Sequence, residues 1–203
     1  MEQVFFINPV AGKRDASAEL VPQIQAAARQ LQLPQPQIVV TQYAGQAREA
    51  AHRYAASGTP AALYACGGDG TLNELVQGAA GSANVAVGCV PCGSGNDYVR
   101  NFGAAGQAPF LDFAAQLQAQ PCRVDLLQTS LGIGIDICAA GLDAQVAYGI
   151  PKFRRLPGCG GTAAYTLSIL QAMLSRFGHK LRVAIDGKEY TGTYMMAAIC
   201  NGG

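Results

Sequence analysis

The 203-residue sequence predicts an α/β fold, with a parallel-sheet domain followed by an incomplete β-rich second domain. Apolar runs of strand length alternate with helical patterns in the first part of the chain, which is typical of a parallel sheet with right-handed crossovers. Three of these predicted strands end in short loops of glycine and small polar residues. The alternation then stops and a hairpin pattern follows. We therefore place a domain boundary near Pro121, between residues 1–120 and a partial C-terminal β-sandwich over residues 121–203.

The predicted elements of the first domain follow from apolar runs and from helix-stopping residues. Runs such as Val4-Phe-Phe-Ile7 are short and rich in strand-forming residues. Gly58 and Pro60 end one helix, and Pro22 is tolerated near the first turn of another. In chain order we predict strand 4–7, helix 17–32, strand 37–41, helix 47–56, strand 61–66, helix 71–78, strand 85–90, a short helix 97–101 and helix 111–120.

The second domain is predicted to be mostly antiparallel. Residues 126–140 are predicted to be strands of a second sheet, and residues 165–177 an amphipathic helix. Strands 180–185 and 188–193 form a hairpin, because the intervening Asp-Gly pair suits the left-handed residues of a primed turn. The basic run 152–155 is interpreted as a solvated loop, with contact to an anionic membrane surface as the alternative.

The most informative run is Cys66-Gly-Gly-Asp-Gly-Thr-Leu-Asn-Glu-Leu75, where a predicted strand meets a helix. Glycines let backbone N–H groups approach an anion closely, and a helix start adds unpaired donors and a favourable dipole. Asp69 would repel a bare phosphate, so a cation between the carboxylate and the phosphate resolves the conflict. The run therefore predicts a phosphate site that works with a metal ion.

Two other loops have the same character. Asn8-Pro-Val-Ala-Gly12 follows the first strand, and Pro91-Cys-Gly-Ser-Gly-Asn-Asp97 follows the fourth. Thr41 stands at the end of another predicted strand. Open α/β sheets bind ligands beyond the carboxyl ends of their strands, so a ligand site at this rim is favoured over an ordinary glycine-rich turn.

Together these motifs resemble the catalytic domain of the diacylglycerol kinase and sphingosine kinase superfamily, and the bacterial lipid kinases in particular. The runs concerned are 8–12, 67–74 and 91–97, and residues 124–126 and 141–146 extend the likeness. The resemblance implies an NAD-kinase/diacylglycerol-kinase-like first domain. It also implies an ATP-dependent lipid kinase, which transfers the γ-phosphoryl group to a lipid hydroxyl such as that of diacylglycerol.

The resemblance also implies the site residues, with ATP and Mg²⁺ as cofactors. Asp69 is expected to act in catalysis through Mg²⁺, with Asp97 and Asp125 as further metal candidates that are alternatively a helix cap or a salt-bridge partner. The family usually has Thr where this chain has Ser94, which keeps the hydroxyl. The expected nucleotide-binding residues are Asn8, Pro9, Val10, Ala11, Gly12, Thr41, Gly68, Asp69, Gly70, Thr71, Leu72, Asn73, Glu74 and Ser94.

In the family, the acidic general base and the ligands of a second, structural metal follow the segment that matches Asn201-Gly202-Gly203. The resemblance thus implies a truncated lipid kinase, with its general base beyond Gly203. We expect the chain to bind adenine nucleotide weakly and to leave lipid unphosphorylated. The edges of an unfinished sheet predict aggregation or a homodimer.

Composition and charge limit the partners. The net charge of +1 and the lack of a basic stripe with aromatics argue against nucleic acid. The N-terminus lacks a secretion signal, and the uncharged runs 75–96 and 156–175 carry glycine and proline, so no transmembrane segment is expected. We expect a cytoplasmic protein that meets its lipid substrate peripherally, at the inner face of the membrane.

Two readings of the cysteines and two rival functions remain. Most of the seven cysteines are interpreted as small buried hydrophobes in a reducing compartment, with Cys89-x-x-Cys92 as a redox or zinc half-site the weaker alternative. The run 67–71 is also similar to that of NAD kinases, which are not expected to carry the other two loops. A non-catalytic nucleotide-binding fragment is the other alternative.

Overall fold

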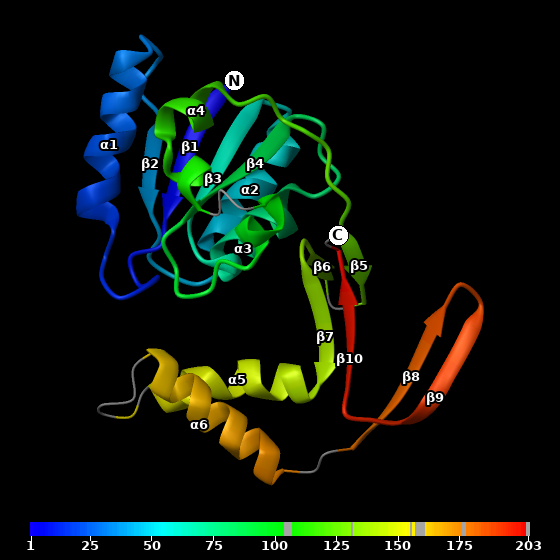
Figure 1. The fold of residues 1–203 in the computed structure, drawn as a ribbon. Helices are drawn as coiled ribbons and strands as arrows, with labels where there is room; N and C mark the ends of the chain where they lie inside the picture. Colours follow the sequence, from blue (N-terminus) through cyan, green and yellow to red (C-terminus); the bar gives the residue numbers. More distant parts are fainter. Residues whose placement is uncertain (104–106, 131, 155, 157–160, 176–177, 202–203) are drawn as a thin grey trace. The chain divides into compact units, whose positions relative to one another are not determined.

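The computed structural model describes residues 1–103, 107–130, 132–154, 156, 161–175 and 178–201 (Figure 1). The chain divides into two compact units, one over Met1–Asp136 together with the end of the chain, the other over Ile137–Cys200. This division by contacts falls after Asp136, and the domain boundary near Pro121 stays a prediction.

A four-stranded parallel sheet forms the centre of the first unit. Its strands are β1 (Glu2–Ile7), β2 (Gln37–Val40), β3 (Ala61–Gly67) and β4 (Val85–Pro91), in the order β2-β1-β3-β4. All three neighbouring pairs are parallel, which confirms the predicted sheet. The chain therefore runs from β1 to one side and then returns to the other side of β1 to add β3 and β4.

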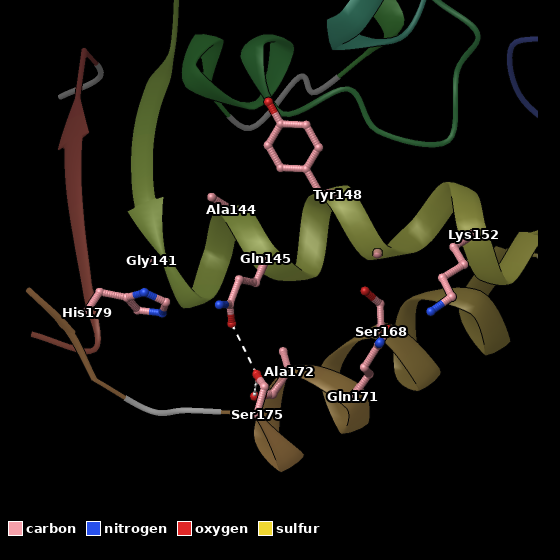
Figure 2. A pocket seen from close by; sticks show the side chains of 11 residues that line it. Gly141, Ala144, Gln145, Tyr148, Lys152, Ser168, Gln171, Ala172, Ser175 and His179 are labelled. Carbon is pink, nitrogen blue, oxygen red and sulfur yellow. Dashed lines mark hydrogen bonds between the residues drawn. The ribbon is translucent and has the colours of Figure 1, made fainter.

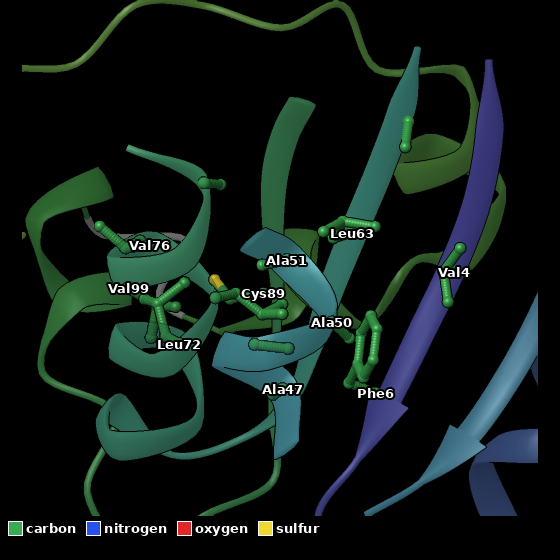
Figure 3. Close-up of a cluster of buried hydrophobic side chains, with 14 residues drawn as sticks. Val4, Phe6, Ala47, Ala50, Ala51, Leu63, Leu72, Val76, Cys89 and Val99 are labelled. Carbon is green, nitrogen blue, oxygen red and sulfur yellow. The ribbon is translucent and has the colours of Figure 1, made fainter. Parts of the chain in front are cut away.

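Helices α2 (Gln46–Ser57) and α3 (Asp69–Ala79) cover one face of this sheet. Phe6 and Leu63 point toward them, and small residues such as Ala51 let the helices approach closely (Figure 3). The predicted helices over 47–56 and 71–78 are thus confirmed, with the second beginning two residues earlier.

Helices α1 (Ser17–Gln30) and α4 (Phe113–Gln118) cover the opposite face. Phe5 stacks on Tyr64 of β3, with ring centroids 4.3 Å apart and planes 11° apart. Pro22 lies in the second turn of α1 and not in the first, so its predicted placement was wrong by one turn.

Two short segments differ from the predicted helices. The predicted helix 111–120 is divided at Asp112, whose side chain accepts a hydrogen bond from the Ala115 N–H at 3.0 Å and begins α4. A separate 3₁₀ turn, η2 (Ala108–Leu111), precedes it. The predicted helix 97–101 is another 3₁₀ segment, η1 (Tyr98–Phe102).

Antiparallel pairs follow the parallel sheet. Strand β5 (Leu127–Thr129) pairs with β6 (Gly132–Gly134) in the first unit. In the second unit β7 (Ile137–Gly141) pairs with β10 (Met196–Cys200). Strands β5, β6 and β7 are those expected over 126–140, and a complete β-sandwich stays a prediction.

The predicted hairpin is confirmed. Strand β8 (His179–Ile185) pairs with β9 (Lys188–Tyr194), in antiparallel register from end to end. The turn residues Asp186 and Gly187 have φ of 48° and 77°, the left-handed values that a type I′ turn requires.

Two antiparallel-packed helices complete the second unit, and the sequence predicted only one of them. Helix α6 (Gly161–Leu174) overlaps the predicted helix 165–177, of which residues 176–177 lie outside the described part. Helix α5 (Leu142–Arg154) was missed, and the residues of the basic run at 152–154 form its last turn, so their interpretation as a loop was wrong. Residue 155 of that run lies outside the described part.

Close packing between α5 and α6 explains why a glycine occurs within α5. A Cβ on Gly149 would collide with the Ser168 hydroxyl of α6. That hydroxyl donates to the Val146 carbonyl at 2.6 Å, and Ser168 is 1% exposed. Among all the helices in the described ranges, none is both long enough and apolar enough to cross a bilayer.

Candidate functional site

The carboxyl ends of the four parallel strands lie along one rim of the sheet. Ile7 pairs with Val40 on one side and Cys66 on the other, and Gly67 pairs with Pro91. The loops that follow β1, β2, β3 and β4 therefore begin beside one another. Because the strand order reverses between β1 and β3, this is the topological switch point where open α/β sheets bind ligands.

A side-chain hydrogen bond joins the loops on either side of this switch point. Asn8 Nδ2 donates to the Thr71 hydroxyl oxygen at 3.1 Å. Asn8 Oδ1 accepts from the Val10 N–H at 3.1 Å, and the Asn8 N–H donates to the Cys66 carbonyl at 2.9 Å. Thr71 is 6% exposed, so the bond is shielded from water. The loop after β1 is thereby fixed to the first turn of α3.

The loop after β1 also touches the loop after β4. Gly12 has φ of 76°, and a Cβ on it would lie 2.5 Å from the Cys92 carbonyl oxygen. Both reasons require glycine at this position. On the other side, Thr41 donates its N–H and its hydroxyl to the Ile7 carbonyl, at 2.8 and 3.3 Å. The predicted residues Asn8–Gly12 and Thr41 thus lie together at the rim.

Glycine occurs on either side of Asp69 for two different reasons. A Cβ on Gly68 would lie 2.5 Å from the Gly95 carbonyl oxygen, which accepts the Asp69 N–H at 3.1 Å. Gly68 therefore lets the loops after β3 and β4 pack against each other. Gly70 is exposed, and a Cβ on it would meet nothing within 4 Å. Packing within the protein therefore does not explain the glycine at position 70.

The Asp69 carboxylate is held by the backbone of the β4 loop. Its Oδ2 accepts from the Asp97 N–H at 3.0 Å and its Oδ1 from the Tyr98 N–H at 3.3 Å. The Asp97 carboxylate forms an exposed ion pair with Arg100 at 2.6 Å. A carboxylate has about four acceptor positions, so each Asp69 oxygen keeps capacity for another contact. The orientation of Asp69 is thus set by the protein itself.

The structure does not gather the three predicted metal carboxylates into one cluster. Within the described ranges, no three His, Cys, Asp or Glu side chains lie close enough together to hold a metal ion. Asp125 is exposed, and its backbone carbonyl accepts from Asn201 Nδ2 at 2.6 Å. Mg²⁺ at phosphate sites commonly uses one or two carboxylates together with phosphate oxygens and water, and Asp69 fits that pattern.

Three of the residues predicted to bind nucleotide lie in α3, where they pack in the core or contact the start of α2. Leu72 is 4% exposed within the core, so only its backbone is available to a ligand. Glu74 Oε1 accepts from the Gly45 N–H at 2.9 Å, at the start of α2. Asn73 is half-buried beside them. Glu74 therefore fastens α2 to α3, which is a structural role that the sequence did not reveal.

Asn96 is a candidate that the sequence analysis missed. Its Nδ2 donates to the Gly93 carbonyl at 2.8 Å, while its buried Oδ1 has no hydrogen-bond partner among the described residues. Ser94, which was predicted, lies exposed on the same loop. The signal available in the sequence was that Asn96 belongs to the Gly-Ser-Gly-Asn-Asp run. That its buried oxygen lacks a hydrogen-bond partner is visible only in the three-dimensional structure.

Cysteines near the rim are protonated core residues. Burial raises the pKa of Cys89 to about 12 and raises the pKa of Cys66 well above its ordinary range. Cys89 packs with the α2 and α3 cluster, whereas Cys92 packs against the α1 and α4 cluster. Their contacts on opposite clusters favour the core interpretation over a metal half-site.

Comparison with known proteins gives a consistent picture. Residues 2–129 match the family described as the diacylglycerol kinase catalytic domain. A diacylglycerol kinase of Bacillus subtilis is 29% identical over 135 residues, which are 66% of this chain and 44% of that protein. One from Staphylococcus aureus is 30% identical over 138 residues, or 66% of this chain and 42% of that protein. The chain spans less than half the length of these relatives.

Solved structures agree on the fold. A crystal structure of a diacylglycerol kinase from Bacillus anthracis matches with a TM-score of 0.64 at 23% identity. The match covers 99% of this chain and 64% of that one. At this identity the likeness concerns the fold alone.

Proposed function

The chain belongs to the diacylglycerol kinase catalytic-domain family, and from this premise we propose that it forms the nucleotide-binding part of an ATP- and Mg²⁺-dependent lipid kinase. The reaction would transfer the γ-phosphoryl group of ATP to a lipid hydroxyl such as that of diacylglycerol. The observation that carries the proposal is the junction of three loops at the switch point, fastened by the Asn8–Thr71 hydrogen bond.

The start of α3 is the proposed phosphate-binding element. The dipole of a helix favours an anion at its start. In α3 the Asp69 N–H already donates to the Gly95 carbonyl and the Thr71 N–H to the Gly68 carbonyl, so the Gly70 backbone is the candidate donor to a phosphate. Gly70 adds an open approach, because no side chain covers the backbone at that point. The exposed Ser94 hydroxyl on the neighbouring loop is a further donor. Asn8–Gly12 and Thr41 would contact the rest of the nucleotide.

Mg²⁺ is proposed to be held by Asp69 together with the nucleotide phosphates, where it would neutralise phosphate charge. Two backbone N–H groups already orient the Asp69 carboxylate, so binding would cost little rearrangement of that side chain. Asp97 and Asp125 would act at longer range, through water, since the structure holds them outside a common cluster.

The acceptor lipid would meet the protein at a membrane surface, with the protein in the cytoplasm and bound peripherally. A homodimer that covers exposed strand edges is part of the same proposal. The described residues would contribute nucleotide binding and orientation of the phosphates, and we assign the role of proton acceptor to none of them.

The first test is titration of the chain with Mg-ATP, Mg-ADP and NAD by calorimetry. We expect saturable binding of Mg-ATP, lost in Asp69→Ala and kept in the control Asp112→Ala, which removes a carboxylate at the start of α4. Tighter binding of NAD than of ATP would support an NAD kinase instead. Absence of nucleotide binding would reject the proposal.

The second test is phosphoryl transfer from radiolabelled ATP, with diacylglycerol and NAD as alternative acceptors. It uses an intact family relative that carries the substitution matching Asp69→Ala. We expect transfer to the lipid in the unmodified relative and a loss on the order of a thousandfold in the variant, since a metal ligand contributes several kcal/mol in the transition state. Turnover that survives the substitution would remove Asp69 from the mechanism.

A further inference from the structure

A groove between α5 and α6 in the second unit is separate from the rim of the parallel sheet. Its volume is about 610 Å³, which is within the range of small-molecule sites. The residues that line it belong to α5, to α6 and the residue directly after it, and to the ends of β7 and β8, so the groove is formed within one unit (Figure 2).

The two helices supply polar side chains at helical spacing. Gln145 and Lys152 of α5 are seven positions apart, about two helical turns, so they share one face of the helix, whereas the Tyr148 side chain points away from α6 (Figure 2). Gln171 of α6 and Ser175, which directly follows α6, are four residues apart and line the same groove. The close approach at Gly149 and Ser168 holds the helices together, so the groove is part of a packed arrangement.

An unpaired polar atom points to a ligand at one end of the groove. His179 Nε2 is buried and has no hydrogen-bond partner among the described residues. Its ring faces Gln145, as Figure 2 shows. The Ser175 hydroxyl, which donates to the Ala172 carbonyl at 2.7 Å, lies 3.3 Å from Gln145 Oε1, and the Gln145 amide carries two N–H donors that a ligand could use. A buried polar group without a partner is costly, so a bound polar group here would be favourable.

The other end of the groove is cationic. The Lys152 amine lies there, and Figure 2 shows its side chain directed toward Ser168 and Gln171. The described lining residues include this lysine and no aspartate or glutamate. Lysine binds phosphate as a point charge, whereas amides and hydroxyls bind hydroxyl groups as both donors and acceptors.

We propose that the α5–α6 groove binds a phosphate-bearing polyol, with its phosphate at Lys152 and a hydroxyl or other polar group at His179. Gln145 and Lys152 are seven positions apart in α5, which corresponds to a rise of about 10 Å along the helix. A glycerol phosphate is long enough to approach both ends, either free or as the headgroup of an anionic phospholipid. The groove is formed by residues of the other unit than the proposed nucleotide site.

The test for the free compound is calorimetric titration of the chain with sn-glycerol 3-phosphate, with glycerol as the uncharged comparison. We expect saturable binding of the phosphate and none of glycerol. Lys152→Gln should weaken binding about tenfold or more, and His179→Phe severalfold, because each removes a hydrogen-bonding group. Lys180→Gln and His52→Phe are matched controls at exposed positions outside the groove and should change nothing.

The test for the lipid source is sedimentation of the chain with phosphatidylglycerol vesicles, with phosphatidylcholine vesicles as the neutral comparison. Binding to these anionic vesicles that is lost in both Lys152→Gln and His179→Phe would assign the phosphate to a lipid headgroup, even if the free compound does not bind. Three results would overturn the proposal: no binding in either assay, equal losses in the matched controls, or a dependence on Lys152 without any on His179, which would indicate surface charge alone. Melting curves of each variant confirm that it is folded.

Discussion

The Asn8 amide and the Thr71 hydroxyl form a 3.1 Å hydrogen bond between residues 63 positions apart in the sequence. The bond crosses the point where the strand order reverses, so it fixes two loops that the parallel sheet only brings near each other. Because Thr71 is buried, losing either partner leaves a polar group without compensation.

Thr71→Val tests this relationship. The substitution removes the acceptor of the Asn8 amide while keeping a similar volume, so we expect a loss of about 1–3 kcal/mol in the free energy of unfolding. Mg-ATP affinity should fall with it, because the loop after β1 loses its anchor. Urea denaturation and calorimetric titration measure the two effects. Thr59→Val, in the loop before β3, is the control and should leave nucleotide affinity intact.

Two substitutions separate the backbone contacts of Asp69 from its proposed role in binding Mg²⁺. Asp69→Asn keeps one carbonyl oxygen to accept a backbone N–H, whereas Asp69→Ala removes both acceptors. We expect the alanine variant to be less stable by about 1–2 kcal/mol, and both variants to lose Mg²⁺-dependent nucleotide binding. Thermal melts and titrations with and without Mg²⁺ provide the comparison. An asparagine variant that binds Mg-ATP normally would show that the carboxylate serves the backbone alone.

Gly70 and Gly58 should respond to valine in opposite ways. Gly70 faces open space without a left-handed backbone, so Gly70→Val should leave stability within about 1 kcal/mol and reduce Mg-ATP affinity. Gly58 has φ of 71° at the end of α2, so Gly58→Val should destabilise by about 1–2 kcal/mol and leave affinity unchanged. If both variants lost affinity equally, the loop at Gly70 would have no special role.

Alkaline pH should destabilise the protein. Burial holds the pKa of Cys89 at about 12, whereas the same thiol in the unfolded chain loses its proton near pH 9. Above that pH the unfolded state binds fewer protons than the folded state, so stability falls by about 1.4 kcal/mol per pH unit for each such thiol, until the folded pKa is reached. Urea melts between pH 8 and 11 measure this slope, and Cys89→Ala should reduce it.

The same burial predicts thiol reactivity. Cys66 and Cys89 should react slowly with a disulfide reagent at pH 8, because the thiolate is scarce and covered. The exposed Cys122 and Cys200 should react first. Mass spectrometry of the partly labelled chain identifies the order.

The parallel half of the fold was predictable because its signals are local. Each strand is an uninterrupted apolar run, and each helix has a stop such as Gly58, so the elements agree with the structure within about two residues. The gathering of the loops followed from the parallel topology. Individual contacts did not: the Glu74 bond to the Gly45 N–H and the unpaired Asn96 oxygen depend on residues far apart in the sequence.

Helix α5 was missed because glycine and proline within it indicate a loop. In the structure α5 continues through Gly149. Glycine is needed at this position because Ser168 of α6 occupies the space that a side chain would need. That requirement arises from the partner helix and is absent from the local sequence. The division of helix 111–120 had a local signal, since Asp112 is a good helix-starting residue, but the apolar pattern outweighed it.

The position of β1 between β2 and β3 has a consequence for the order of events during synthesis. The N-terminus leaves the ribosome first, so β1 and β2 are able to pair before β3 has been made. Strand β3 then joins the other edge of β1, and the hydrogen bond between Asn8 and Thr71 forms only after α3 has been made. The proposed binding of ATP would therefore follow the pairing of β3 with β1, and it would mark a nascent chain whose sheet has formed on both sides of β1.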